Sequence, residues 1–323
     1  RRPDSGAVAA DVATSDAVSV TEETMTLAPP IPAEGVVSWN INTACNYRCS
    51  YCTQRFMEDR GRWSRDTPRF LAGFAKLPGR WEIKMSGGEP FVHPTIHEIT
   101  AGLAEIGHRI SIVTNFSASV AKLREFVDAA RGRVGVFSCS LHREYVTDVA
   151  AFIQKAQWMR DTLLAARDES LPPPSLNVTT VATRQAIPDL VHLASQFAQA
   201  GVTFKIQPEK IDGGIIEYSE QEREQLVSLG GHNRTGQLAH VYTGEPCWSG
   251  ARYFILDDRG VAYRCYPARR HKMERLGDFL SDSFALFLAP RPCPYPLCYC
   301  TVPIERGLMR KPSPAGNHAQ GQT

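Results

Sequence analysis

Strand-like runs and helical stretches alternate through the middle of this chain, and the alternation restricts the fold more than any other feature. Six apolar runs typical of strands span residues 36–42, 82–86, 109–114, 134–140, 176–181 and 203–207. Stretches with helical periodicity lie between them at 67–76, 95–106, 119–130, 147–167 and 189–200. Because parallel strands need long crossover connections, this order predicts βα units around a parallel sheet. The pattern by itself fits an open barrel and a doubly wound sheet equally well.

Three cysteines follow the first strand-like run, in the segment Cys45-Asn-Tyr-Arg-Cys49-Ser-Tyr-Cys52. Three thiolates can surround an iron–sulfur cluster but cannot complete it, because a [4Fe–4S] cube takes four protein ligands. One iron would stay open for a small molecule, like the open position of a catalytic zinc site. Zinc binding and a chance spacing are the alternatives. Ligands bind at this end of the strands in parallel α/β folds.

A glycine-rich segment, Ser86-Gly87-Gly88-Glu89-Pro90, ends the second run. Its glycines allow a close approach of the backbone to a ligand, and Glu89 adds an acceptor. Together with the cysteine spacing, this segment resembles the signature of the radical S-adenosylmethionine (SAM) enzymes. The resemblance implies a partial (β/α)6 barrel, a [4Fe–4S] cluster held by Cys45, Cys49 and Cys52, and SAM on the open iron.

The resemblance also implies a set of SAM-binding residues. Tyr51 would lie near the adenine, Gly87, Gly88 and Glu89 would contact the amino group, and Asn115 and Ser140 would face the carboxylate and ribose. Gln207 and Glu209 end the sixth run, and one of them, with Gln207 as the candidate, is expected to line the cavity. The alternative for Asn115 and Ser140 is that short polar residues simply end strands. Cys139 is expected in the core, and His93, His97 and His108 at the surface.

A second group of cysteines lies near the C-terminus, at Cys247, Cys265, Cys293, Cys298 and Cys300. The first two flank a predicted hairpin, 252–256 and 260–264, around Asp257-Asp258-Arg259-Gly260. A hairpin flanked by cysteines resembles the twitch domain, a shortened SPASM extension that binds an auxiliary [4Fe–4S] cluster. A zinc ribbon is the alternative. Five cysteines for four places leave one surplus thiol among Cys293, Cys298 and Cys300, which is a candidate hydrogen-atom donor in catalysis.

Length and composition describe an ordinary globular protein of 323 residues with a net charge of +2, which predicts neither nucleic-acid nor membrane binding. No apolar run is long enough to span a bilayer, and no signal sequence is recognisable. The odd number of cysteines, nine, favours a reducing cytoplasm over a disulfide framework. The expected organisation is a disordered leader (1–35), barrel (36–210), linker (211–244), twitch-like domain (245–305) and tail (306–323).

The function that the resemblance implies is reductive cleavage of SAM to a 5′-deoxyadenosyl radical, which takes hydrogen from a substrate. A small polyhydroxylated substrate (a sugar, aminocyclitol or nucleotide of a natural-product pathway) is the first expectation, with oxidation or epimerisation as outcome. Flavodoxin or ferredoxin is the expected electron donor. A maturase acting on a ribosomal peptide is the alternative. A third class, a non-catalytic iron–sulfur or zinc scaffold or regulator, does not need the Gly-Gly-Glu segment.

Overall fold

The computed structural model describes residues 34–211, 214–230, 242–296, 298 and 302–309. Within these residues the main sheet has nine strands in the order β12-β11-β10-β1-β2-β3-β4-β5-β6. The first six strands in the chain are β1 (Gly35–Asn42), β2 (Trp81–Gly87), β3 (Arg109–Thr114), β4 (Val134–Ser140), β5 (Ser175–Ala182) and β6 (Thr203–Pro208). All neighbours among β1–β6 pair in parallel. The six predicted strands are therefore confirmed, each within one residue of the expected ends.

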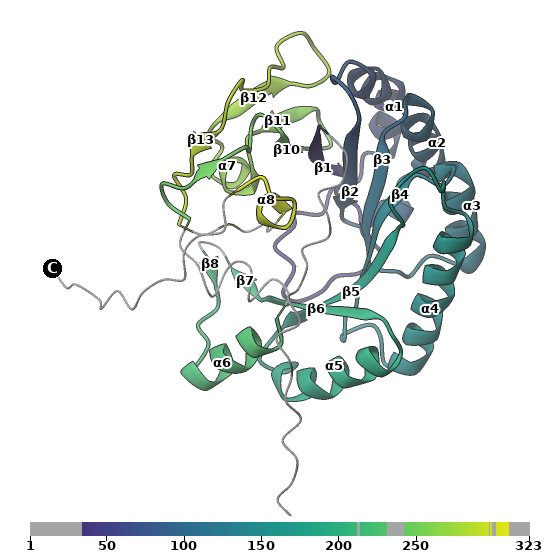
Figure 1. Ribbon diagram of the computed structural model, residues 1–323, viewed down its shortest axis with the longest axis vertical. Coiled ribbons are helices and arrows are strands. Elements are labelled where there is room, and N and C mark those ends of the chain that lie inside the picture. The colour runs from purple at the N-terminus through teal and green to yellow at the C-terminus, as the bar shows by residue number, and fades with distance from the viewer. Residues whose placement is uncertain (1–33, 212–213, 231–241, 297, 299–301, 310–323) are drawn as a thin grey trace, which may run out of the picture.

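The helices between these strands cover the convex face of the curved sheet (Figure 1). They are α1 (Arg60–Ala75), α2 (Ile96–Ile106), α3 (Val120–Ala130), α4 (Val149–Ala165) and α5 (Leu190–Gln199), with 3-10 turns at Pro90–Val92 and Ile187–Asp189. Alternate residues of each strand face this layer and are buried there. Trp39 of β1, for example, packs on Phe70 and Phe74 of α1 at ring-centroid distances of 4.7 and 5.0 Å.

Helix α1 begins seven residues before its predicted start. Its N-cap is Asp59, whose side chain accepts a hydrogen bond from the backbone N–H of Arg62. The first turns are polar and therefore lack the apolar periodicity on which the prediction depended. Ser119 was predicted to cap α3, and its hydroxyl does accept from the N–H of Lys122.

The hairpin near the C-terminus is present, but it continues the main sheet. Strand β10 (Tyr253–Leu256) pairs in parallel with β1, and β11 (Val261–Tyr263) and β12 (Arg275–Asp278) follow it in antiparallel order. We expected this hairpin in a separate small domain. The edge of β1 that a partial barrel leaves open is instead paired with β10, which satisfies its backbone hydrogen-bonding groups.

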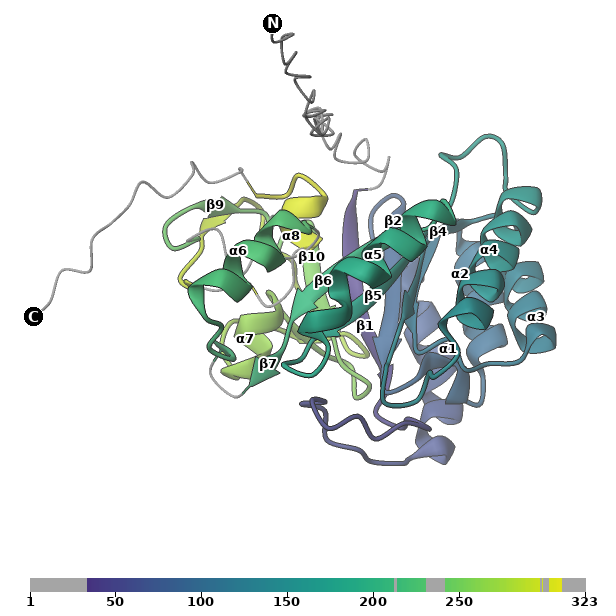
Figure 2. The ribbon, with the colours of Figure 1, turned by 90° about the horizontal axis from the view of Figure 1, so that it is seen from below.

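Shorter elements complete the described chain. They are β7 (Lys210–Ile211), β8 (Gly214–Ile215), α6 (Glu220–Ser228), β9 (Pro246–Cys247), α7 (Tyr266–Arg270), β13 (Arg291–Pro292) and α8 (Val302–Glu305). Helices α7 and α8 lie on the concave side of the sheet (Figures 1 and 2). Val36 on the inner face of β1 packs there in one apolar cluster with Ala268 and Val302.

Two of the three histidines expected at the surface are buried, so that expectation was wrong for them. His108 is 1 % exposed, and its ring nitrogens bond the Trp81 N–H and the Phe74 carbonyl. His93 is 3 % exposed. Cys139 lies in the core as expected. In the described part of the chain, no helix has both the length and the apolar character to span a membrane.

Candidate active site around the cysteine loop

The three N-terminal cysteines lie on a loop between β1 and α1, at the C-terminal edge of the parallel strands. The hydroxyl of Thr43 donates to the carbonyl of Met57 over 2.8 Å and closes the base of this loop. Cys45 and Cys49 are half-buried and Cys52 is exposed. Burial raises the pKa of Cys45 and raises that of Cys49 to about 11. Without a metal these two side chains are therefore neutral thiols at pH 7.

The Gly-Gly-Glu segment lies directly against the start of the cysteine loop. The N–H of Gly88 donates to the carbonyl of Asn42 over 3.2 Å, and that of Glu89 donates to Ala44 over 2.8 Å. A Cβ on Gly88 would stand 1.9 Å from the Ala44 carbonyl oxygen, so only glycine allows this approach. Gly87 has φ +143°, which also favours glycine. These glycines thus fix the position of the first cysteine.

The carboxylate of Glu89 is fully buried and makes three hydrogen bonds within the protein. It accepts from the N–H of Phe91 (3.0 Å), the hydroxyl of Thr114 (2.7 Å) and the N–H of Asn115 (2.6 Å). Burial raises its pKa above the ordinary value, although these hydrogen bonds act against the increase. Glu89 therefore ties the end of β2 to the end of β3, and its expected contact with SAM stays a prediction.

The loop after β4 fastens the cysteine loop from the opposite side. Glu144 accepts hydrogen bonds from the N–H and hydroxyl of Ser50, and Tyr145 accepts one from the N–H of Arg48 over 2.7 Å. Tyr47 stacks on Tyr145 with ring centroids 4.1 Å apart. His142 precedes Glu144 and Tyr145 in the loop after β4 and faces the cysteine loop.

His142 contacts two residues of the cysteine motif. Its Nδ1 lies 2.7 Å from the Tyr51 hydroxyl and 3.4 Å from the Cys49 sulfur. Burial lowers the pKa of His142 to about 4, with Glu144 acting in the opposite direction, so the imidazole is neutral at pH 7. The Tyr51 hydroxyl is also a hydrogen-bond partner of Cys49.

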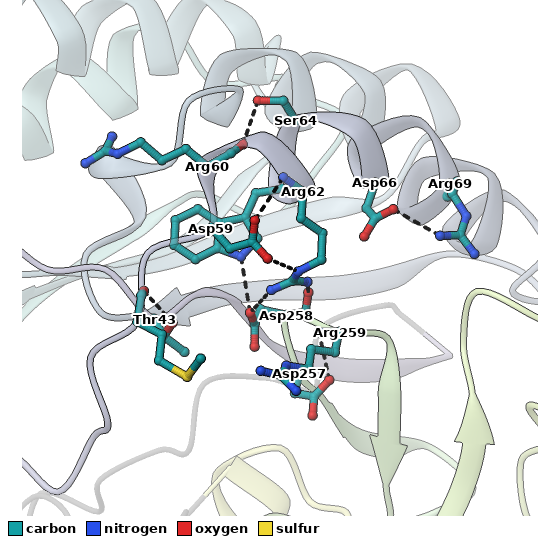
Figure 3. A network of polar contacts seen from close by, with 12 residues as sticks. Thr43, Asp59, Arg60, Arg62, Ser64, Asp66, Arg69, Asp257, Asp258 and Arg259 are labelled. Carbon is teal, nitrogen blue, oxygen red and sulfur yellow. Dashed lines mark hydrogen bonds and ion pairs between the residues drawn. The ribbon is translucent and has the colours of Figure 1, made fainter.

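A polar network joins the start of α1 to the turn between β10 and β11. Arg62 bonds Asp59 at 2.8 Å and Asp258 at 2.6 Å, and the indole N–H of Trp63 donates to the same Asp258 carboxylate over 3.1 Å (Figure 3). Asp258 is buried, which strengthens these contacts. The network connects the added hairpin to the helix that follows the cysteine loop.

A family model described as the radical SAM superfamily matches residues 39–195 of this chain. These residues run from β1 to α5 and contain the cysteine loop and the Gly-Gly-Glu segment. This segment of the chain is a radical SAM domain. Such a domain implies SAM and a [4Fe–4S] cluster as cofactors, as the sequence analysis expected.

Similar proteins have several functions. The PqqA peptide cyclase of Methylorubrum populi is 33% identical over 107 residues, 32% of this chain and 28% of that protein. The GTP 3′,8-cyclase of Listeria monocytogenes is 29% identical over 151 residues, 44% of each chain. The structure of SuiB from Streptococcus suis has a TM-score of 0.51 at 14% identity, covering 76% of this chain and 64% of that one, and shows the shared fold. The matches thus span less than half of the curated relatives.

The donors of the cysteine loop suit a radical SAM cluster. Cys52 raises the pKa of both Cys45 and Cys49, and Cys45 raises that of Cys49, so the three lie within electrostatic range of one another. Among the described residues, no group of three or more His, Cys, Asp or Glu converges as the ligands of one ion do. Three thiolates that do not converge on one ion can still hold one [4Fe–4S] cube, because each thiolate binds a different iron atom. Ligation by these thiols would release their protons.

The remaining predicted SAM contacts lie at different distances from the loop. The Asn115 amide donates to the Asn46 side chain over 2.8 Å and lies 3.9 Å from the Cys45 sulfur, so it touches the loop directly. Ser140 ends β4 just before His142. Gln207 lies on β6, which is separated from β4 by β5. The structure thus places Asn115 next to the cysteines, whereas Gln207 lies on β6, the last of the parallel strands.

A cleft of about 300 Å³ opens beside the cysteine loop, a volume at the lower end of the range for small-ligand sites. Ser50 and Tyr51 form part of its wall. The other lining residues come from the loop after β4, the end of β5, the segment that follows it and α5, namely Arg143, Glu144, Thr180, Val181, Thr183, Gln185, Ala186, Asp189 and Leu193. Glu144 and Tyr145 were not among the site residues predicted from the sequence. Their position just after a strand that ends at the ligand-binding edge is the signal that could have found them.

Four of the five C-terminal cysteines line one cavity on the concave side. They are Cys247, Cys265, Cys293 and Cys298, and Ser249, Arg264 and Tyr295 share this cavity with them. Burial raises the pKa of Cys265 to about 12 and also raises that of Cys293. Cys300 lies outside the described residues. Of the described cysteines, none forms a disulfide.

Proposed function

We propose that this protein is a radical SAM enzyme that modifies a peptide. The observation that carries the substrate class is the 33% identity to a PqqA peptide cyclase over 107 residues. This reverses the order of our two expectations, since a small polyhydroxylated substrate came first from the sequence. A nucleotide substrate is the second candidate, because the GTP 3′,8-cyclase of Listeria monocytogenes is 29% identical over 151 residues.

The charges around the cleft favour a peptide over a nucleoside triphosphate. Among the described residues that line it, Arg143 is the cation, whereas Glu144 and Asp189 are acidic. A triphosphate carries a high negative charge and is usually bound by several cations or a metal. A peptide is bound by a mixture of hydrogen-bond donors and acceptors. The side chains of Thr183 and Gln185 add groups of both kinds to the wall of the cleft.

The residues of the loop would each have a defined part in this activity. Cys45, Cys49 and Cys52 would hold the cluster, which when bound supplies the electron that cleaves SAM. Gly87, Gly88 and Glu89 would contact the amino group of SAM, and Glu89 also ties the end of β2 to the end of β3 through its hydrogen bonds. Tyr51, Asn115, Ser140 and Gln207 remain the proposed contacts to the rest of SAM and to the cavity. Flavodoxin or ferredoxin remains the proposed electron donor.

The peptide proposal is tested by coexpression of the full chain with each short open reading frame next to its gene. Mass spectrometry of the recovered peptides should show the loss of two hydrogen atoms if a cross-link forms, or deuterium uptake in heavy water if a residue is epimerised. A variant with Cys45, Cys49 and Cys52 replaced by alanine is the control and should leave the peptides unchanged. Unmodified peptides, together with consumption of added GTP by the purified enzyme, would favour the nucleotide candidate instead.

We further propose that Cys247, Cys265, Cys293 and Cys298 hold an auxiliary [4Fe–4S] cluster. The support is their shared cavity, which supplies four thiols to one space. The cluster would accept an electron from the substrate radical in an oxidation. Cys300 is then the surplus thiol that the sequence analysis left unassigned among three cysteines.

Single alanine substitutions should separate these roles. We expect Cys247→Ala, Cys265→Ala, Cys293→Ala and Cys298→Ala each to lower the auxiliary iron content, because each removes one of the four thiolates that hold this cube. Cys300→Ala should keep the iron content of the unaltered protein, measured after anaerobic reconstitution. Loss of iron in Cys300→Ala with retention in Cys293→Ala or Cys298→Ala would reassign the surplus thiol. Zinc in place of iron at this site would contradict the cluster itself.

A further inference from the structure

The Cys49 sulfur has a pair of side-chain hydrogen-bonding groups beside it. The Nδ1 of His142 is 3.4 Å from this sulfur, a distance typical of an N–H···S hydrogen bond, and the Tyr51 hydroxyl is a second partner. The rings of Tyr51 and His142 stack, with centroids 6.0 Å apart and planes at 20°. Tyr47 meets the same imidazole edge-on at 5.9 Å. The imidazole is therefore held in place by packing as well as by hydrogen bonds.

The chemistry of a ligating thiolate assigns the direction of these hydrogen bonds. A cysteine bound to iron carries no proton and only accepts, so its partners must donate. A neutral imidazole has one N–H, and the Tyr51 hydroxyl has one O–H. With the N–H on Nδ1, this proton is shared between the Tyr51 oxygen at 2.7 Å and the Cys49 sulfur at 3.4 Å, and the Tyr51 O–H is left to point at the sulfur.

We propose that His142 and Tyr51 are positioning residues that donate hydrogen bonds to the Cys49 thiolate and thereby raise the reduction potential of the SAM-binding cluster. Reduction adds a negative charge to the cluster, and a donor at a ligand sulfur stabilises that charge. The inference rests on the proposal that Cys49 is a cluster ligand. It concerns the ease of electron entry and is independent of the substrate class.

The test is an anaerobic redox titration of the reconstituted full chain, followed by electron paramagnetic resonance. The signal of the SAM-binding cluster is identified by its change when SAM is added. His142→Phe removes Nδ1 but keeps an aromatic ring, and we expect its reduced fraction at a fixed potential to fall about tenfold. For a one-electron couple this corresponds to a potential about 59 mV lower. Tyr51→Phe should change the potential in the same direction.

Two controls separate this tuning from a purely structural role. His142→Asn places an amide N–H near the position of Nδ1 and should restore most of the potential. His192→Phe changes an exposed histidine on α5 and should leave the potential unchanged. An unaltered potential in both His142→Phe and Tyr51→Phe, with full iron content, would overturn the proposal.

Two further results bear on the proposal in different ways. Loss of the SAM-responsive signal in His142→Asn as well as in His142→Phe would also overturn it, since His142 would then only hold the loop. Survival of that signal in Cys49→Ala would show that Cys49 is not a ligand. This result would contradict the proposal that Cys49 is a cluster ligand. An unchanged potential in a protein whose Cys49 does bind the cluster would instead contradict the hydrogen-bond proposal.

Discussion

Replacing Cys45, Cys49 and Cys52 together with alanine is expected to abolish SAM cleavage and to remove about half of the bound iron. The unaltered protein should hold about eight irons, as two [4Fe–4S] cubes. The two cysteine groups lie in different parts of the fold, one on the loop after β1 and the other around the concave-side cavity. Loss of the first should therefore leave the second intact.

Iron content and the formation of 5′-deoxyadenosine with dithionite and SAM measure this prediction. Cys139→Ala is a matched control, since Cys139 is fully buried in the convex-side core and should affect neither quantity. Continued formation of 5′-deoxyadenosine by the triple variant would contradict the assignment of the cysteine loop. A loss of all iron would show that the auxiliary site depends on the loop.

Arg306→Ala is expected to destabilise the protein by about 3 kcal/mol, because it leaves a buried carboxylate without its partner. Arg306 follows α8 and reaches the inner face of β2, where its Nε and Nη2 atoms each lie 2.9 Å from the carboxylate of Glu82. Glu82 is 0 % exposed. Burial by itself raises the pKa of Glu82, but Arg306 and the Ser111 hydroxyl bring it below the ordinary value.

The expected measurement is a fall of at least about 6 °C in the melting temperature of the anaerobic, reconstituted protein. Arg69→Ala is the matched control, because Arg69 pairs with Asp66 within α1 and its side chain is 57% exposed. An exposed pair of this kind contributes roughly 0–1 kcal/mol. An equal effect of the two substitutions would contradict the importance of the buried pair.

The same ion pair predicts the direction of a pH effect. Glu82 has a lowered pKa in the folded protein, so its contribution is complete above the pKa of an unfolded glutamate and is lost as pH falls through the folded value. The difference in melting temperature between the unaltered protein and Arg306→Ala should therefore shrink in acid. A difference that grows on acidification would contradict this account.

Local sequence patterns were sufficient to predict the parallel core and to locate the three-cysteine motif at its edge. The six strands were predicted within one residue because each is a compact apolar run, and the spacing of Cys45, Cys49 and Cys52 is itself local. Helix α1 was predicted too short, since its first turns depend on a cap at Asp59 and on contacts with Asp258. The buried histidines were missed because a lone polar residue gives no sign of the partners that it finds in the fold.

The sequence by itself determined the βα order, the cysteine motif and the glycine-rich segment beside it, because the residues that form each of these features lie close together in the chain. Only the tertiary structure decided that β10 pairs with β1, that the loop after β4 braces the cysteines, and that Arg306 neutralises Glu82. These contacts join residues about 90 to 220 positions apart. Periodicity reports which face of one element is apolar, whereas pairing across such separations depends on which edges and charges the complete fold leaves unsatisfied.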